Sequence, residues 1–149
     1  MNIPRPYLSQ GKEYGSMTLE IYTDGASRGN PGPASYAYLI MKDSEEMTRG
    51  SGFLGKTTNN RAEYKAVIEA LSKVRSENEK VVVNSDSRLV VNQMSGKWKV
   101  KSQNLQPLHT EVKELAEGFK EVSFNHVPRE NKYISIVDGM CNEELDRQA

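Results

Sequence analysis

The 149-residue sequence has a single cysteine, Cys141, and no hydrophobic run that approaches the length of a membrane-spanning helix. One cysteine cannot form an intramolecular disulfide, so we expect a protein of a reducing compartment, the cytoplasm. A membrane span needs about 18 to 20 consecutive apolar residues, and the N-terminus also lacks the apolar stretch of a signal peptide. The sequence therefore predicts a soluble protein that is not held at a membrane.

The sequence also lacks a net charge, because 20 Lys and Arg residues balance 20 Asp and Glu residues. Nucleic-acid-binding proteins usually carry surplus positive charge, yet a neutral total can combine a basic groove with an acidic metal site. The hydrophobic share of 36% and the charged share of 27% are ordinary for a globular protein. The length suits one domain with a core of its own, and we expect a monomer.

Residues 1–16, MNIPRPYLSQGKEYGS, are polar and show no periodic pattern. We expect them to form a flexible tail, and Met17 would be the natural start if the tail derives from an expression tag. Residues 17–149 then form one folded domain, since no linker, repeat or low-complexity tract divides them.

The apolar residues in the rest of the chain follow either the two-residue period of strands or the 3.6-residue period of helices. Strands are predicted at 18–24, 35–42, 46–54, 80–85 and 121–127 from alternation or, for 80–85, from three consecutive valines. Helices are predicted at 60–74, 87–95 and 103–118 and from about Val137 onward. The polar stretch Lys42–Glu46 would be a hairpin turn. Three hairpin-type strands followed by two strands joined through helices predict a five-stranded mixed sheet with helices packed on it.

Four acidic residues lie where these strands end or helices begin: Asp24, Glu63, Asp86 and Asp138. Such ends can converge at one edge of an α/β sheet. Clustered carboxylates raise one another's pKa unless cations neutralise them, and oxygen ligands suit Mg²⁺ or Mn²⁺. Two such ions can activate water and stabilise the leaving oxygen of a phosphodiester. The alternative is that each acid is an ordinary residue at a common surface position.

Four segments resemble, in order, the motifs of type 1 ribonucleases H. They are IYTDGASRGNPGPASYAYLI, TTNNRAEYKAVIEAL, VVVNSDSRLVVNQMSG, and HVPREN with VDGMCNEELD, and the resemblance covers about Thr18 to Asp146. It implies an α/β fold of the ribonuclease H-like kind, with three antiparallel strands, then two parallel strands, and helices on both faces of the sheet.

The resemblance also implies an endonuclease that hydrolyses the RNA strand of RNA–DNA hybrids by a two-metal-ion mechanism, leaving 5′-phosphate and 3′-hydroxyl ends. Two Mg²⁺ or Mn²⁺ ions would bind with the substrate. Asp24, Glu63, Asp86 and Asp138 would be the catalytic, metal-binding acids.

The expected substrate contacts are Gly25, Asn30, Thr58, Asn59, Asn60 and Trp98. The asparagines could read ribose 2′-hydroxyls, Gly25 would let the backbone approach the RNA strand, and Thr58 resembles the family's phosphate-pocket threonine on the DNA strand. Trp98 lies among lysines and could stack on a sugar or base. The structural alternatives are a turn at Asn30, helix caps at Asn59 and Thr58, and a Trp98 that packs inward.

The segment Val127–Asn131 departs from the family pattern, because it lacks the histidine of the Gly-His-x-Gly loop that many members carry. Glu130 is a candidate for the missing group, and the stretch before Asp138 is longer than usual. Two other functions fit the same fold: a non-catalytic hybrid-binding module, or a nuclease that acts on other duplexes. The four acids favour catalysis over the first, and the Asn-rich motifs favour the hybrid over the second.

Overall fold

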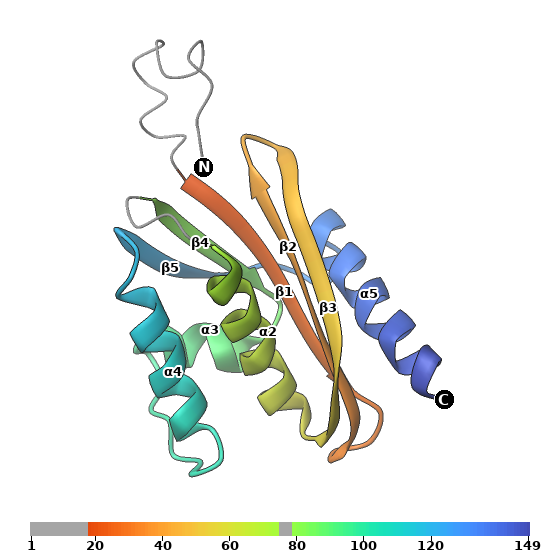
Figure 1. Cartoon of the computed structure of the whole chain (residues 1–149). Coiled ribbons are helices and arrows are strands. Elements are labelled where there is room, and N and C mark those ends of the chain that lie inside the picture. The colour runs from red at the N-terminus through yellow and green to blue at the C-terminus, as the bar shows by residue number, and fades with distance from the viewer. Residues whose placement is uncertain (1–17, 75–78) are drawn as a thin grey trace.

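A computed structural model describes residues 18–74 and 79–149, so the proposed tail at residues 1–16 lies outside the described residues. The fold is one mixed sheet with helices on both faces (Figure 1). Its strands are β1 (Thr18–Ser27), β2 (Gly32–Lys42), β3 (Glu45–Thr57), β4 (Lys80–Ser85) and β5 (Glu121–His126). Its helices are α2 (Asn59–Lys73), α3 (Arg88–Met94), α4 (Gln106–Ala116) and α5 (Lys132–Gln148).

The strands follow the spatial order β3-β2-β1-β4-β5. Strands β1, β2 and β3 pair antiparallel, whereas β4 pairs parallel with β1 and with β5, as expected from the sequence. The β2–β3 hairpin turns at Asp43 and Ser44, whose φ angles of 54° and 66° are those of a tight hairpin turn. The predicted five-stranded mixed sheet and its hairpin turn are therefore confirmed.

Two hydrophobic cores fill the two faces of the sheet, because the residues of β2 alternate between them. Tyr38 and Ile40 belong to the core that β1, β4, α2 and α4 complete, whereas Leu39 and Met41 pack against α5. Figure 1 shows α2, α3 and α4 on one side of the sheet and α5 on the other. Among the described residues, none of the helices combines the length and apolar character that crossing a bilayer requires.

The last helix begins earlier than the sequence predicted. It starts at Lys132 rather than near Val137. The Oδ1 atom of Asn131 accepts hydrogen bonds from the backbone N–H groups of Tyr133 and Ile134, at 2.9 and 3.2 Å, and this cap starts the helix. The stretch that looked like a long loop before Asp138 is thus mostly helix.

The backbone of α2 lies directly against β1 at Gly25. A Cβ atom on this residue would lie 2.2 Å from the carbonyl carbon of Ala62 and 2.4 Å from the backbone nitrogen of Glu63. Both neighbours are backbone atoms of α2, so they cannot move without the helix. Gly25 is therefore required by packing, whatever its role toward a substrate.

We predict that Gly25→Ala destabilises the protein by about 1 to 3 kcal/mol, because the methyl group overpacks the contact with α2. Gly139→Ala is the matched control: Gly139 lies inside α5, and a Cβ there meets no heavy atom within 4 Å. This second change should stabilise the protein by about 0.5 to 1 kcal/mol, since alanine favours a helix interior. Urea unfolding in EDTA measures both. A Gly25→Ala variant as stable as the unchanged protein would contradict the packing argument.

Candidate functional site

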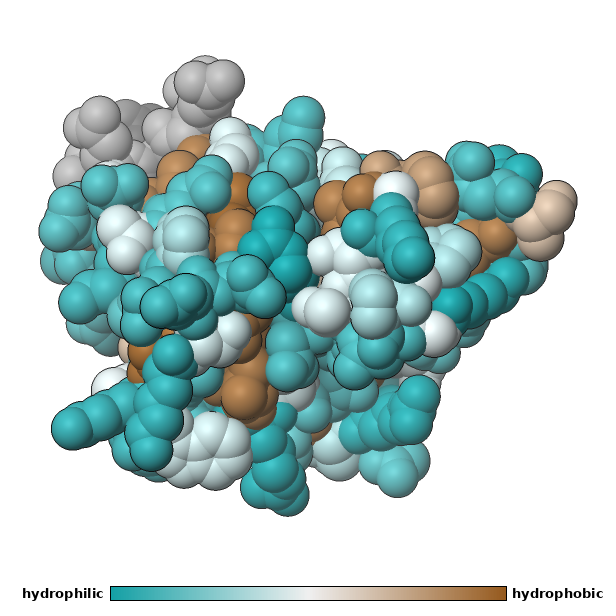
Figure 2. Space-filling model, turned by 90° about the horizontal axis from the view of Figure 1, so that it is seen from below, coloured by the Kyte–Doolittle hydropathy of each residue, from teal (hydrophilic) through white to brown (hydrophobic). Residues whose placement is uncertain are grey.

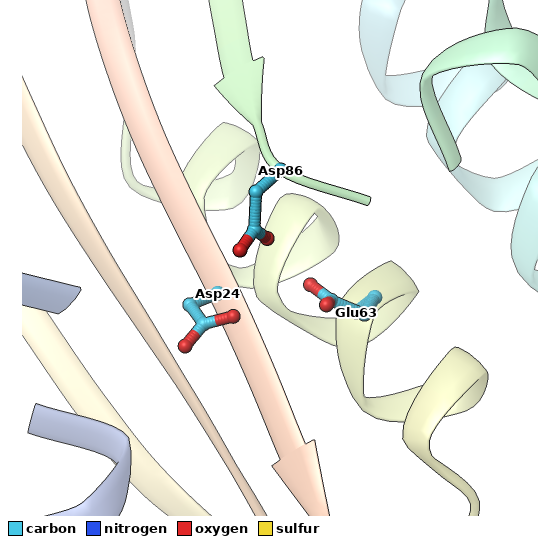
Figure 3. Close-up of side chains that lie close together, drawn as sticks. All are labelled: Asp24, Glu63 and Asp86. Carbon is cyan, nitrogen blue, oxygen red and sulfur yellow. The ribbon is translucent and has the colours of Figure 1, made fainter. Parts of the chain in front are cut away.

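Three carboxylates from three different elements meet beside β1. Asp24 lies on β1, Glu63 on α2, and Asp86 directly after β4. One carboxylate oxygen of each lies within 4.8 Å of the others. Figure 3 shows the three side chains directed toward one another. Only 6% of Asp24 and of Glu63 is exposed, so the two acids are removed from bulk water.

The position of Asp24 corrects the sequence prediction, which placed it at the end of a strand. Strand β1 continues to Ser27, but its pairing with β4 ends at Tyr22 and Asn84. Beyond this point β1 has lost its neighbour on that side, and the backbone N–H of Gly25 donates instead to Oε1 of Glu63, at 3.0 Å. The end of β4, not the end of β1, therefore opens the space that the acids share.

Glu63 also differs from its predicted position in the first turn of α2. Thr58 caps this helix by accepting from the backbone N–H of Arg61, at 3.2 Å, so Glu63 is the fifth helical residue. The helix cap is thus Thr58 and not Asn59. The bond from Gly25 then fixes the carboxylate of Glu63 over β1.

The fourth acid, Asp138, lies beside Asp24 and shares a side-chain hydrogen bond with it. It is the seventh residue of α5, so the expectation that it sits at the N-terminal end of the helix is wrong. One turn later, Cys141 ties α5 to the sheet: its Sγ atom donates to the carbonyl oxygen of Asp24, at 3.4 Å, and its own carbonyl accepts from the hydroxyl of Ser35, at 2.9 Å. Asp146 instead forms an exposed ion pair with Arg28, at 2.6 Å.

Burial and mutual repulsion make this cluster costly in the absence of a cation. Burial, followed by the charges of Asp86 and Asp138, raises the pKa of Asp24 to about 8. Burial and the charge of Asp24 also raise the pKa of Glu63 well above its usual range. The pKa of Asp86 is raised by burial, although the nearby positive charge of Arg129 opposes the shift. The site thus favours either protons or bound cations.

All four acids line one open cavity of about 440 Å³. Gly25 and Asn59 line it as well, as do Ser27, Ser87, Arg129 and Asn142. Sequence reasoning considered Glu130 in this loop and missed Arg129. Glu130 is exposed and is not among the lining residues, whereas Arg129 brings a positive charge to the acids. The sequence pointed to Arg129 only through its position in the loop after β5.

A second cavity of about 390 Å³ lies on the other side of the start of α2. Three predicted substrate residues, Asn30, Thr58 and Asn60, line it together with Lys99 and Lys101. The start of α2 therefore separates the two cavities, with Asn59 on the acidic side and its two neighbours on the basic side. Figure 2 views the end of the molecule where α2 begins, which is mostly hydrophilic with small hydrophobic areas between polar residues.

Two side chains hold the walls of this second cavity. Arg61 donates from Nη1 to the carbonyl oxygen of Asn104, at 2.7 Å, and from Nε to the hydroxyl of Thr57, at 3.1 Å. The Oδ1 atom of Asn30 accepts from the backbone N–H of Asn59, at 3.0 Å. Trp98 is 49% exposed and lines neither cavity, so the alternative that it packs inward is excluded.

Comparison with known proteins decides the family, because the family model described as RNase H matches residues 16–149. The chain belongs to the ribonuclease H family. A ribonuclease H of Thermoanaerobacter sp. is 35% identical over 142 residues, which cover 87% of this chain and 90% of that protein. A bifunctional protein of Mycobacterium tuberculosis is 38% identical over 136 residues, covering 89% of this chain but only 37% of its own length.

Solved structures agree with this family assignment and with the type 1 group. The crystal structure of RNase H1 from Halobacterium salinarum superposes with a TM-score of 0.81 at 35% identity and covers 87% of this chain and 98% of that one. LC11-RNase H1, crystallised in complex with an RNA/DNA hybrid, gives a TM-score of 0.80 at 35% identity, with 87% of this chain and 98% of that chain covered. The ribonuclease H-like fold is thereby established.

We predict that the melting temperature of this protein in EDTA falls as pH rises from about 5 to about 8. The raised pKa of Asp24 means that the folded state holds a proton that the unfolded state releases above about pH 4, so stability is lost up to about pH 8. Mg²⁺ or Mn²⁺ should raise the melting temperature most at the alkaline end. Differential scanning calorimetry measures these shifts. The control Asp24→Asn should flatten the slope in EDTA, and an equally steep slope in that variant would contradict the assignment.

Proposed function

We propose that this chain is an endonuclease that hydrolyses the RNA strand of RNA–DNA hybrids and leaves 5′-phosphate and 3′-hydroxyl ends. The observation that carries the proposal is the convergence of Asp24, Glu63, Asp86 and Asp138 in one cavity, separated from a basic cavity by the start of α2. Membership in the ribonuclease H family supports the same activity.

The residues of the acidic cavity fit divalent cations. Hard oxygen ligands suit Mg²⁺ and Mn²⁺, and bound cations would relieve the repulsion that raises the pKa values of Asp24 and Glu63. The four acids would hold two such ions. When bound, the ions supply an activated water and stabilise charge on the leaving oxygen. The protein's part is to hold these carboxylates at fixed positions from β1, α2, β4 and α5.

The other predicted contacts divide between the two strands of a hybrid. Gly25 and Asn59 line the acidic cavity, where a backbone group and an amide can contact the 2′-hydroxyls of the RNA strand. Thr58 lines the basic cavity and would contact a phosphate of the DNA strand, as expected. Asn30 and Asn60 line the same cavity, so we propose that they contact DNA phosphates instead of the 2′-hydroxyls expected from the sequence. Trp98 is exposed among lysines and would lie against a sugar or base beyond this cavity.

A related ribonuclease H1 was crystallised with an RNA/DNA hybrid, which supports this substrate for the present chain. A non-catalytic hybrid-binding module would have no need for four acids whose mutual repulsion destabilises the protein. A nuclease of the same fold that acts on other duplexes is the remaining alternative, and the assay below separates it from the first proposal. We also propose a monomer that works in the cytoplasm.

The expected activity is cleavage of the RNA strand of a hybrid only when Mg²⁺ or Mn²⁺ is present. A short run of deoxyribonucleotides placed within the RNA strand should abolish cleavage inside that run, because specificity comes from 2′-hydroxyls. Gel analysis of end-labelled RNA–DNA, RNA–RNA and DNA–DNA duplexes measures this. Full activity in excess EDTA, or equal cutting of double-stranded DNA, would overturn the proposal. Tight binding of hybrids without any cleavage would favour the binding module.

A second prediction concerns the fourth acid. Asp138→Asn should reduce the cleavage rate by roughly 10² to 10³, because a charged group at the reacting centre is lost. Its melting temperature in EDTA should stay unchanged or rise, since one of four repelling carboxylates is removed. Asp146→Asn is the matched control on the same helix, and it should change neither quantity strongly because its ion pair is exposed. If Asp138→Asn keeps near-normal turnover in Mg²⁺, the assignment of the fourth acid is wrong.

A further inference from the structure

The basic cavity contains a buried amide that the proposed function leaves without a role. Gln93 lies in the last turns of α3 and lines this cavity, although only 6% of it is exposed. Its Oε1 atom accepts a 2.6 Å hydrogen bond from the hydroxyl of Tyr64, a fully buried residue of α2. One end of the amide is therefore fixed by the protein.

The other end of the amide is available. Within residues 18–74 and 79–149, the Nε2 atom of Gln93 makes no hydrogen bond. This atom is also accessible to solvent. Among the described residues, the solvent-inaccessible side-chain polar atoms that lack a hydrogen bond are Oγ1 of Thr23 and Oε2 of Glu79, and Nε2 of Gln93 is not one of them. The two N–H donors of the amide thus remain for something that enters the cavity.

A hydrogen bond from α2 orients this amide, and a contact with α4 holds the backbone of α3 beside it. The hydroxyl of Tyr64 donates to Oε1, and this bond turns Nε2 the other way. The carbonyl oxygen of Gln93 accepts from the backbone N–H of Gly96, at 3.2 Å, and lies 3.3 Å from Nε2 of His109 on α4. His109 is half-buried, and its ring contacts the backbone of α3.

The chemistry of the cavity selects an anionic ligand. Lys99 and Lys101 line it, and none of its ten lining residues is acidic. Thr58 and Asn60 add a hydroxyl and an amide. Donors with positive charge and no competing carboxylate suit a phosphate group, whose oxygens only accept hydrogen bonds.

We propose that Gln93 donates a hydrogen bond to one phosphate of the uncleaved strand, and that Tyr64 is the positioning residue that turns the amide toward it. The inference rests on the proposed function, since it takes the hybrid as the ligand of both cavities. The simpler reading is that Gln93 serves only to satisfy the hydroxyl of Tyr64. The two roles predict different results when the Nε2 donors are lost. Only a direct contact weakens binding of the hybrid at one particular phosphate.

The test uses Gln93→Glu, which keeps an acceptor for Tyr64 but replaces the N–H donors with an oxygen that repels phosphate. Steady-state cleavage is measured on hybrids whose DNA strand carries one uncharged methylphosphonate at successive positions. With the unmodified hybrid, KM should rise by about tenfold or more while kcat changes little, as for loss of a charge-assisted hydrogen bond. When the methylphosphonate replaces the phosphate that Gln93 contacts, the KM of Gln93→Glu should exceed that of the unchanged protein by less than about threefold.

Gln103→Glu is the matched control, because Gln103 is exposed between Ser102 and Asn104 but does not line the cavity. It introduces the same charge nearby, so its effect should be smaller and the same at every methylphosphonate position. Tyr64→Phe removes only the hydrogen bond that orients the amide, so it should raise KM less than Gln93→Glu does. Its KM difference should disappear at the same methylphosphonate position. If Gln93→Glu does not fold, Gln93→Met and Tyr64→Phe carry the same comparison.

Several results would overturn the inference. Gln93→Glu, or Gln93→Met in its place, would leave KM unchanged if the amide only satisfies Tyr64. A deficit of equal size at every methylphosphonate position would mean general repulsion and no specific contact. An unchanged protein that cuts no hybrid would overturn the proposed function and this inference together, whereas cleavage in which the Gln93 variants match the unchanged protein overturns this inference alone.

Discussion

The contact between Gly25 and α2 is the constraint on which the rest of the site depends. Because Gly25 has no side chain, the backbone of α2 can lie against β1, and the N–H of Gly25 can reach the carboxylate of Glu63. This bond is possible because β4 no longer pairs with β1 beyond Tyr22. A larger residue would push the helix outward and take Glu63 away from Asp24. The same packing that stabilises the sheet therefore fixes the distance between two of the acids.

This proximity has an electrostatic cost that the rest of the fold must offset. Asp24 is buried among other acids, and its pKa of about 8 means that it resists ionisation at neutral pH. The second core, on the opposite face of the sheet, holds α5 and brings Asp138 to the cluster in spite of the repulsion. The bonds of Cys141 to both β1 and β2 secure the helix one turn beyond Asp138. Destabilised charges supported by a rigid scaffold are expected at catalytic sites.

The sequence predicted those features that depend on local patterns. The three valines predicted the bounds of β4 as the structure has them, and the helix predicted at 103–118 forms as α4 with its apolar side chains in the core. The start of α5 was placed too late because the apolar pattern was followed and the cap at Asn131 was overlooked, although asparagine is a favoured cap residue. Gln93 and Arg129 were not singled out, since their surroundings are formed by segments far apart in the chain. Period and spacing carry no information about such contacts.

The neutral total charge, which counted slightly against a nucleic-acid enzyme, is explained by how the charges are distributed. Acids line one cavity, lysines line the other, and the first residues of α2 lie between them. A hybrid placed across this ridge would present one strand to the acids and the other to the lysines. Only the first strand would meet cations that can assist hydrolysis, whereas the second would be held by its phosphates. In this arrangement the cleaved strand is the one that lies on the acidic side of α2. The 2′-hydroxyl contacts on that side would select the RNA strand for this position.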